Sequence, residues 1–312
     1  MILTITLNPA IDKTIELSGF GIGRLNKVEN VILDPGGKGI NVSKVIESLG
    51  GKSITSGFLG GTAGDYIENA LTKLGIKADF VTINGETRTN LKIFDAESKE
   101  TTEINEPGPH VTSDEIEQLM QKIENIVKPP CMVVLSGSAP QSIPSDVYKR
   151  IVEVSKEKGA VVFVDASGPA FEAALEAKPE FIKPNKHELE IYFNKPCDSD
   201  EALAEACTHF LEKGIENVII SLGKDGAFYA NAHQTVRLHP LKVDAHSSVG
   251  AGDAFVGACA YAYEKQYDTD EMLRLAVATS AGAVMTIGTK PMDVEWITHQ
   301  LDRVVIEPHE KR

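Results

Sequence analysis

Short apolar runs alternate with amphipathic segments along the chain from about residue 131 onward. The runs CMVVLSG, AVVFVDASG, FIKPN and NVIISLG are mostly apolar, and each adjoins a segment whose apolar residues recur at helical spacing. Almost continuous apolar strands that alternate with helices indicate a parallel sheet covered on both faces. Two earlier runs at 2–7 and 53–60, with predicted helices near 38–49 and 64–74, join this sheet. The pattern therefore predicts a layered α/β fold.

Two stretches depart from this rhythm. Residues 11–34 and about 78–106 alternate polar and apolar positions without forming a good amphipathic helix. This alternation is typical of antiparallel strands joined by turns such as Asn84-Gly85. We interpret the two stretches as one small sheet, inserted into a single domain over 1–312, that serves as a lid or a dimer surface. The alternative is that they are ordinary edge strands of the main sheet.

Bulk composition narrows the class of partner. The chain has 312 residues, 42% of them apolar, and a net charge of −14, with an isoelectric point near 5.1. Nucleic acid and anionic membranes both attract positive fields, so neither is expected as a partner, and an anionic substrate has to be met by local cations. No signal peptide or membrane span is apparent. The cysteines lack any C-x-x-C pair, which indicates reduced thiols in a cytoplasmic protein: Cys131, Cys197, Cys207 and Cys259.

The common nucleotide-binding signatures fail. The segment GKS at 51–53 ends like a P-loop, but Ile46 stands where that motif requires glycine. The glycine pairs at 37–39 and 250–252 both lack the third glycine of a dinucleotide fingerprint. A Walker-type nucleotide site and a Rossmann dehydrogenase are therefore excluded.

The segment PGGKGINVSKVIESLG (35–50) opens a predicted helix with three glycines and contributes Lys38 and Asn41 at its start. Backbone N–H groups, an ammonium and an amide together suit a polyol or a phosphate. The alternative is a glycine-rich turn packed closely against a strand. Lys38 favours the ligand site, because a cation between glycines has little packing to do.

A second glycine-rich segment, SSVGAGDAFVGA (247–258), places Asp253 behind Gly250 and Gly252 where an apolar helix begins. Exposed N–H groups and the start of a helix attract an anion. The alternative is that Asp253 only caps the helix. A cap leaves the two glycines unexplained, whereas an anion hole for a migrating phosphoryl group requires them.

These two segments resemble the signatures of the ribokinase-like carbohydrate kinases, also called the phosphofructokinase B family. The resemblance covers the whole chain, because further segments follow in the family's order: TLNPAIDKT (6–14), GETRTNLKI (85–93), LSGSAP (135–140), KPNKHELE (183–190) and SLGKDGA (221–227). It implies a ribokinase-like three-layer α/β/α sandwich, with a mostly parallel sheet and a small β-sheet lid. It also implies a kinase that uses ATP and Mg²⁺.

The resemblance also implies roles for individual residues. Asp253 is the base for the sugar hydroxyl, and the positive potential around it keeps it ionised near neutral pH. The anion hole is formed by Gly250, Ala251 and Gly252, together with the amide of Asp253. Glu188 organises Mg²⁺, for which one carboxylate and retained water suffice. The sugar is bound by Asp12, Arg24, Lys27, Gly37, Lys38, Asn41, Arg88, Asn90 and Ser138. The nucleotide is bound by Lys183, Asn185, Ser221, Gly223, Gly226, Ser247 and Val249.

The substrate implied is a sugar phosphate. Arg24, Lys27, Lys38 and Arg88 could hold a phosphate already on the sugar, although Arg24 and Lys27 taken singly are typical surface charges. The motifs resemble the phosphosugar branch of the family, and the 6-phosphofructokinase branch typically has glycine where Lys38 stands. Fructose 1-phosphate is favoured, with tagatose 6-phosphate next.

Two other functions are compatible with the sequence. The chain could be a kinase of an unphosphorylated sugar or nucleoside, or a non-catalytic sugar-phosphate sensor. A homodimer through the lid is expected. A monovalent-cation loop occurs in some relatives, and the corresponding positions here are Ser247, Val249, Ala283 and Gly288.

Overall fold

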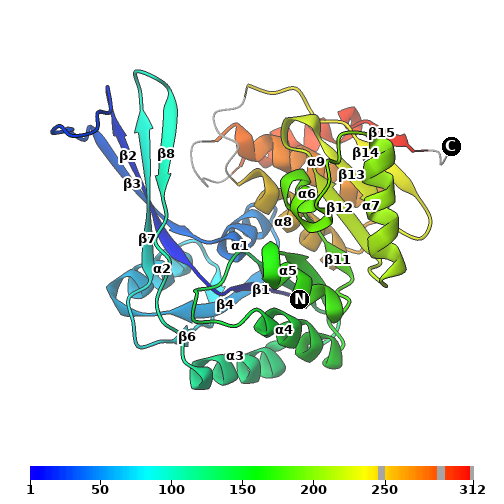
Figure 1. Ribbon diagram of the computed structural model, residues 1–312, viewed down its shortest axis with the longest axis horizontal. Helices are drawn as coiled ribbons and strands as arrows, with labels where there is room; N and C mark the ends of the chain where they lie inside the picture. The colour runs from blue at the N-terminus through cyan, green and yellow to red at the C-terminus, as the bar shows by residue number, and fades with distance from the viewer. Residues whose placement is uncertain (245–249, 287–291, 310–312) are drawn as a thin grey trace.

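The computed structural model describes residues 1–244, 250–286 and 292–309, and its centre is a large mixed sheet (Figure 1). Pairing is parallel from β12 through β5 and antiparallel from β12 to β15. In spatial order the strands are β15 (Ile306–Pro308), β14 (Thr235–Leu238), β13 (Ala227–Ala230), β12 (Asn217–Ser221), β11 (Phe181–Ile182), β10 (Val161–Asp165), β9 (Met132–Ser136), β1 (Ile2–Thr6), β4 (Ser53–Leu59) and β5 (Lys77–Ala78), and β6 (Val81–Thr82) also pairs with β4.

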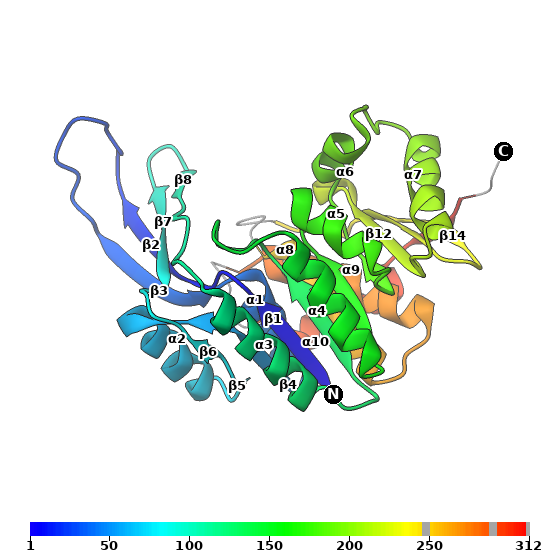
Figure 2. The same cartoon turned by 60° about the horizontal axis from the view of Figure 1, so that its bottom comes forward.

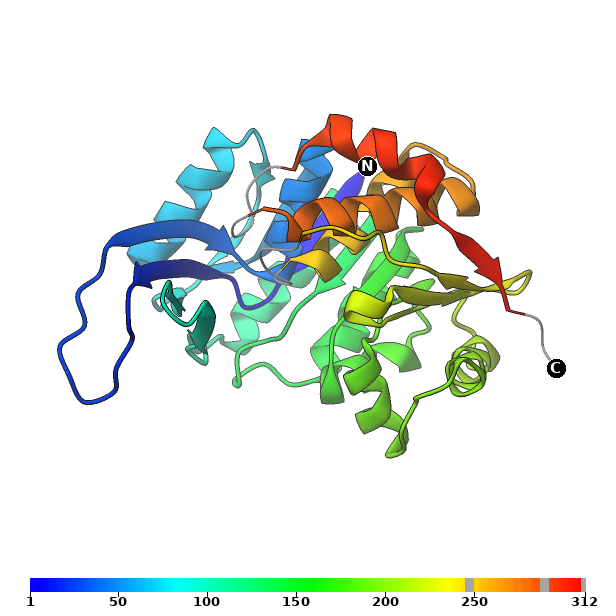
Figure 3. The same cartoon turned by 90° about the horizontal axis from the view of Figure 1, so that it is seen from above.

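Helices cover both faces of this sheet (Figure 3). One face carries α3 (Ser113–Ile126), α4 (Asp146–Glu157), α5 (Gly168–Glu176), α6 (Lys186–Phe193) and α7 (Asp200–Glu212). The other carries α1 (Lys38–Ser48), α8 (Ala251–Glu264), α9 (Thr269–Val284) and α10 (Val294–Gln300). Helix α2 (Gly61–Lys73) packs with Ile40 and Leu59 near β4, and two 3₁₀ turns are η1 (Gly223–Asp225) and η2 (Leu301–Arg303). The predicted three-layer α/β/α fold is confirmed.

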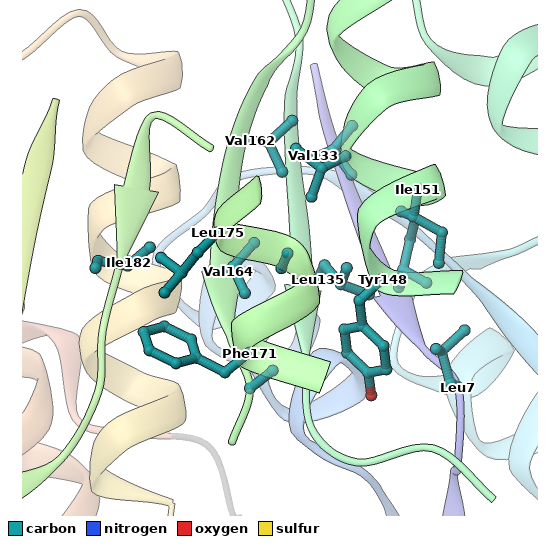
Figure 4. Close-up of a cluster of buried hydrophobic side chains, with 14 of the residues drawn as sticks. Leu7, Val133, Leu135, Tyr148, Ile151, Val162, Val164, Phe171, Leu175 and Ile182 are labelled. Atoms are coloured by element: carbon teal, nitrogen blue, oxygen red, sulfur yellow. The ribbon is translucent and has the colours of Figure 1, made fainter. Parts of the chain in front are cut away.

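Alternation along the strands explains why they look continuously apolar in sequence. In β9, Val133 and Leu135 join the cluster under α4 and α5, whereas Met132 and Val134 join the cluster under α1 and α8. Successive strand side chains point to opposite faces of a sheet, and here each face meets a helical layer. Figure 4 shows the first of these clusters, in which Tyr148 and Phe171 from the helices lie over the strands.

A separate sheet, which we call the lid, projects from the main body (Figures 1 and 2). Its spatial order is β3 (Asn30–Gly36), β2 (Ala10–Leu17), β7 (Arg88–Asp95) and β8 (Glu100–Ile104). The pairs β3–β2 and β7–β8 are antiparallel, but β2 and β7 run parallel. The expectation of an entirely antiparallel lid is therefore wrong, because its two halves enter from the main sheet in the same direction.

The second excursion into the lid begins later than predicted. Residues 77–82 form β5 and β6, which pair with β4 in the main sheet. The turn at Asn84-Gly85 therefore links the main sheet to β7, and the hairpin turn of the lid lies at 96–99 instead. Short strands at the edge of the main sheet alternate polar and apolar residues just as the lid strands do. The sequence pattern therefore does not distinguish the two kinds of strand.

Two further sequence expectations concern the environment of the chain. All four cysteines are buried and free of disulfides. Within the described ranges, no helix combines the length and the apolar character needed to cross a membrane.

Candidate active site

A cleft of about 1240 Å³ lies at the carboxyl ends of the main parallel strands and extends to the lid. This edge is where ligands bind in open α/β sheets. Most of the predicted site residues line the cleft, although they come from distant parts of the sequence: Asp12, Gly37, Lys38, Asn41, Arg88, Asn90, Ser138, Lys183, Asn185, Glu188, Ser221, Gly223, Gly226, Gly250, Ala251, Gly252 and Asp253.

Two predicted residues within the described part of the chain are not among those that line the cleft. Arg24 and Lys27 lie in the exposed loop that joins β2 to β3, at the far end of the lid (Figure 2). The guanidinium of Arg24 donates to the backbone carbonyl of Gly19 within the same loop. Neither side chain lines the cleft of this chain, because the long lid strands carry the loop away from it. Their role in binding the sugar stays a prediction. Ser247 and Val249 lie outside the described residues, as does Gly288 of the predicted cation loop.

The start of α8 lies at the cleft and has backbone donors without intrahelical acceptors. Gly250 is the N-cap in the left-handed conformation, with φ of 85°, which glycine adopts without steric cost. The first helical bond runs from the N–H of Ala254 to the carbonyl of Gly250, at 2.8 Å. The N–H groups of residues 251–253 precede that bond and therefore have no intrahelical acceptor. This geometry suits an anion.

Asp253 does not cap this helix. It is the third residue of α8, and no side chain forms a cap hydrogen bond there. Its Oδ2 instead accepts a hydrogen bond of 2.8 Å from Nδ2 of Asn41 on α1, and the side chain lies buried at the wall of the cleft. The capping alternative is therefore wrong, and the carboxylate is aimed across the interface between the two glycine-rich segments.

The pKa of Asp253 is raised to about 6, mainly by burial and also by the nearby negative charge of Asp165. The hydrogen bond from Asn41 and the ammonium groups of Lys38 and Lys183 oppose this shift. Loss of solvent therefore outweighs the positive potential at the helix start. The prediction that Asp253 is ionised near neutral pH is compatible with this value. With a pKa of about 6, roughly nine-tenths of the carboxyl groups are still ionised at pH 7.

The glycines at the start of α1 bring that helix against β1. Gly37 has φ of 114°, and a Cβ there would lie 2.6 Å from Cγ2 of Thr6. A Cβ on Gly39 would lie 2.8 Å from the carbonyl oxygen of Ile5. Close packing against a strand therefore explains these two glycines. Lys38 and Asn41, which the same turn positions, line the cleft.

Sequence reasoning missed Asp165, which ends β10 and is 1% exposed. Its Oδ1 lies 3.3 Å from Nζ of Lys38 and 3.3 Å from Nζ of Lys183. Its buried Oδ2 has no hydrogen-bond partner within the described part of the chain. Burial alone would raise the pKa of Asp165, but the two ammonium groups lower it below its ordinary value. A carboxylate after the apolar run VVFV, at the carboxyl end of a buried strand, is the signal that could have identified it.

Lys183 joins this carboxylate to the anion site. It is 4% exposed, and a Cβ built on Gly252 would lie 3.4 Å from its Nζ. The ammonium therefore sits beside the first turn of α8. An anion at that turn would meet backbone donors and a buried cation together, which is the arrangement that stabilises charge on a transferring phosphoryl group.

The Asn185-x-x-Glu188 segment forms a capping box at the start of α6. The N–H of Asn185 donates to Oε2 of Glu188, and the N–H of Glu188 donates to Oδ1 of Asn185, both at 2.8 Å. The second oxygen of Glu188 stays outside this cap, and the residue lines the cleft. Across the described residues, no three acidic, histidine or cysteine side chains gather into a metal cluster. The Glu188 oxygen outside the cap fits a hard cation such as Mg²⁺, which takes one carboxylate and keeps water and phosphate oxygens as its other ligands.

Comparison with known proteins identifies the class of this fold and cleft. A family model described as pfkB family carbohydrate kinase matches residues 5–296. The 1-phosphofructokinase of Borreliella burgdorferi is 37% identical over 286 residues, which cover 91% of this chain and 92% of the relative. The 1-phosphofructokinase of Bacillus subtilis is 34% identical over 292 residues, which cover 93% and 95%.

Solved structures agree with these relatives. Phosphofructokinase-2 of Escherichia coli in complex with potassium matches with a TM-score of 0.92 and 27% identity, over 97% of this chain and 98% of the other. The same enzyme has been solved with fructose-6-phosphate and in a tetrameric inhibited form. The fold and its cleft are thus those of a sugar phosphotransferase. The chain belongs to the pfkB family of carbohydrate kinases, as its glycine-rich segments predicted.

Proposed function

We propose that this chain is a 1-phosphofructokinase, which transfers the γ-phosphoryl group of ATP to the 6-hydroxyl of D-fructose 1-phosphate. The products are fructose 1,6-bisphosphate, ADP and a proton. The observation that carries this proposal is the buried Asp253 carboxylate beside the unpaired N–H groups of α8, in one cleft with the cationic side chains of the lid. The relatives named 1-phosphofructokinase, at 34–37% identity, support the choice of sugar phosphate.

The transfer step uses groups that are already in position. The Asp253 carboxylate accepts the proton of the sugar hydroxyl, and the hydrogen bond from Asn41 fixes the orientation of that carboxylate. The hydroxyl oxygen forms a bond to the γ-phosphorus as the bond to the β,γ-bridging oxygen breaks. The α8 amides and Lys183 stabilise the charge on the moving group. Since phosphoryl transfer depends mainly on alignment and charge stabilisation, a carboxylate with a pKa of about 6 is a sufficient base.

The nucleotide occupies the end of the cleft away from the lid. Ser221 and Gly223 border the triphosphate there, with Lys224 as a further cation. An apolar wall of the cleft suits a purine base and consists of Leu241, Phe255, Val277, Ala281 and Val284. Glu188 would hold Mg²⁺, which would neutralise charge on the phosphates. A monovalent cation stays a prediction, because most of its loop lies outside the described residues.

The outer face of the lid suits a second copy of this chain. Val31 and Leu33 on β3 and Ile104 on β8 are 41–54% exposed, and Ile22 and Leu25 in the adjoining loop are 86–95% exposed. Exposed aliphatic side chains gathered on one sheet and its loop mark an interaction surface. We therefore propose a homodimer through the lid. The free, buried thiols fit a cytoplasmic enzyme.

The substrate is tested by a coupled kinase assay with ATP and a panel of fructose, tagatose, fructose 1-phosphate, fructose 6-phosphate and tagatose 6-phosphate. We expect kcat/KM to be highest for fructose 1-phosphate, by at least about tenfold, because loss of a charged contact costs about that factor. EDTA should abolish activity and added Mg²⁺ should restore it. A clear preference for tagatose 6-phosphate or for a neutral sugar would overturn the proposed substrate, and no turnover with any of them would overturn the kinase.

A further inference from the structure

We propose that Lys92 on the lid strand β7 is a second contact for the phosphate that the sugar already carries, and so helps to select a phosphorylated ketose. This inference rests on the proposed function and names a residue that the sequence reasoning did not assign. Lys92 lines the cleft, and its side chain is 16% exposed.

Register places this lysine on the cleft face of the lid. Arg88, Asn90 and Lys92 alternate along β7, and all three line the cleft. Side chains two apart along a strand share one face. Lys92 follows Arg88 by four residue steps, which is about 13 Å along the strand. The lid therefore offers two cations at different depths of one wall, with the Asn90 amide between them.

Hydrogen bonding leaves Lys92 able to bind an anion. Its Nζ lies 3.2 Å from Oδ2 of Asp12, and Nδ2 of Asn90 donates to the other oxygen of Asp12 at 3.1 Å. Asp12 is the one partner of Lys92 among the residues that the structure describes. An ammonium has three donors, so two N–H groups stay available to a ligand. Arg88 donates through both terminal nitrogens, to the carbonyl oxygens of Glu106 and Asn8, and its buried Nε has no partner within the described part of the chain. Both lid cations therefore keep N–H groups for a ligand.

The charged side chains on the cleft face of the lid show why Lys92 is needed to bind a phosphate. From the described part of the lid, the charged side chains that line the cleft are Asp12, Glu103, Arg88 and Lys92. Glu103 lies directly opposite Lys92 in the β7–β8 pair, and Asp12 is its ion-pair partner. Without Lys92, two carboxylates and one guanidinium of the lid would face the cleft, and a dianionic phosphate at this wall would meet net negative charge from the lid. Arg24 and Lys27 are not among the residues that line the cleft of this chain.

The test compares Lys92→Met with Lys92→Arg and with Lys99→Met, which removes an exposed lysine from the hairpin turn of the lid. For Lys92→Met we expect the KM for fructose 1-phosphate to rise about 10- to 100-fold, the usual effect of losing a charged hydrogen bond. The kcat and the KM for ATP should stay within about threefold, because Lys92 touches neither the nucleotide end nor Asp253. Lys92→Arg should recover most of the affinity, since it keeps the charge, and Lys99→Met should match the wild type.

Competition by inorganic phosphate provides the second readout. We expect phosphate to inhibit the wild type competitively against fructose 1-phosphate, and its inhibition constant to rise in Lys92→Met by about the same factor as KM. An unchanged KM and unchanged phosphate inhibition in Lys92→Met would overturn the inference and leave Lys92 as the counter-ion of Asp12. A fall in kcat without a change in KM would do the same. If the wild type itself phosphorylates no ketose phosphate, the proposed function fails first, so the two failures are distinguishable.

Discussion

Asp253→Asn should lower kcat by about 10²- to 10⁴-fold, the usual contribution of a general base, while the affinity for ATP changes little. The amide has the shape of the carboxylate but cannot accept the hydroxyl proton. The nucleotide contacts proposed for Lys183, Ser221 and Glu188 are left in place, so binding of ATP should persist. Steady-state kinetics with fructose 1-phosphate, and titration of ATP by calorimetry, measure the two quantities separately.

Asp225→Asn is the matched control for this variant. Asp225 is an exposed carboxylate in the η1 turn, next to cleft residues but not among them. Its loss should leave kcat within about twofold, the range of surface substitutions away from a site. If Asp253→Asn kept wild-type turnover, Asp253 would be a buried partner of Asn41 and no base. If ATP affinity fell together with turnover, the amide would have disturbed the anion site as a whole.

Asp165→Asn should cost about 3–5 kcal/mol of unfolding free energy at pH 7, because it leaves the buried ammonium of Lys183 without its partner. The pKa of Asp165 is lowered in the folded state, so its stabilisation is present at neutral pH. It is lost only as the pH falls below the ordinary aspartate value near 4 and through the lowered folded pKa. The difference between variant and wild type, measured by urea unfolding, should shrink accordingly in acid.

Asp198→Asn is the comparison for stability. Asp198 pairs with Lys186 at 2.5 Å, but its side chain is 73% exposed. An exposed ion pair contributes about 0–1 kcal/mol, so this variant should unfold almost like the wild type. Equal stability of Asp165→Asn and Asp198→Asn would contradict the role given to Asp165 in holding Lys38 and Lys183.

The same Asp165 variant should also move the pH profile. In the wild type we expect kcat/KM to fall as the pH drops through about 6, because Asp253 must be ionised to accept a proton. The charge of Asp165 helps to raise the pKa of Asp253. Its removal should therefore shift the acid limb to lower pH in the residual activity. A loss of stability alone would not move this limb, so the profile separates an electrostatic role from a purely structural one.

Much of the fold could be predicted, because its signals are local and repeated. The apolar runs gave the strands near their observed bounds, and the glycines at 36–39 and 250–252 marked the starts of α1 and α8. The edge of the lid was less predictable. Residues 77–82 pair with the main sheet, and which sheet a short edge strand joins depends on contacts far away in sequence.

Site residues that belong to a recognised motif were predicted from the sequence. Site residues that only the three-dimensional fold brings to the cleft were missed. Asp165 lies outside the quoted motifs, and Lys92, although part of GETRTNLKI, was given no role there. Their meaning appears only when β10 and β7 bring them to the cleft. Arg24 and Lys27 do not line the cleft of this chain, and charge alone does not show how far a loop reaches. The raised pKa of Asp253 was not foreseen, because the depth of burial cannot be read from a helix start.

The most direct test of the account is a crystal structure of the protein with fructose 1-phosphate and a non-hydrolysable ATP analogue. We expect the 6-hydroxyl oxygen within about 3 Å of an Asp253 carboxylate oxygen, which is the reach of a general base. The terminal phosphate of the analogue should lie on the amides of residues 251–253. A sugar bound with its 6-hydroxyl turned away from Asp253, or a terminal phosphate bound elsewhere in the cleft, would contradict the account.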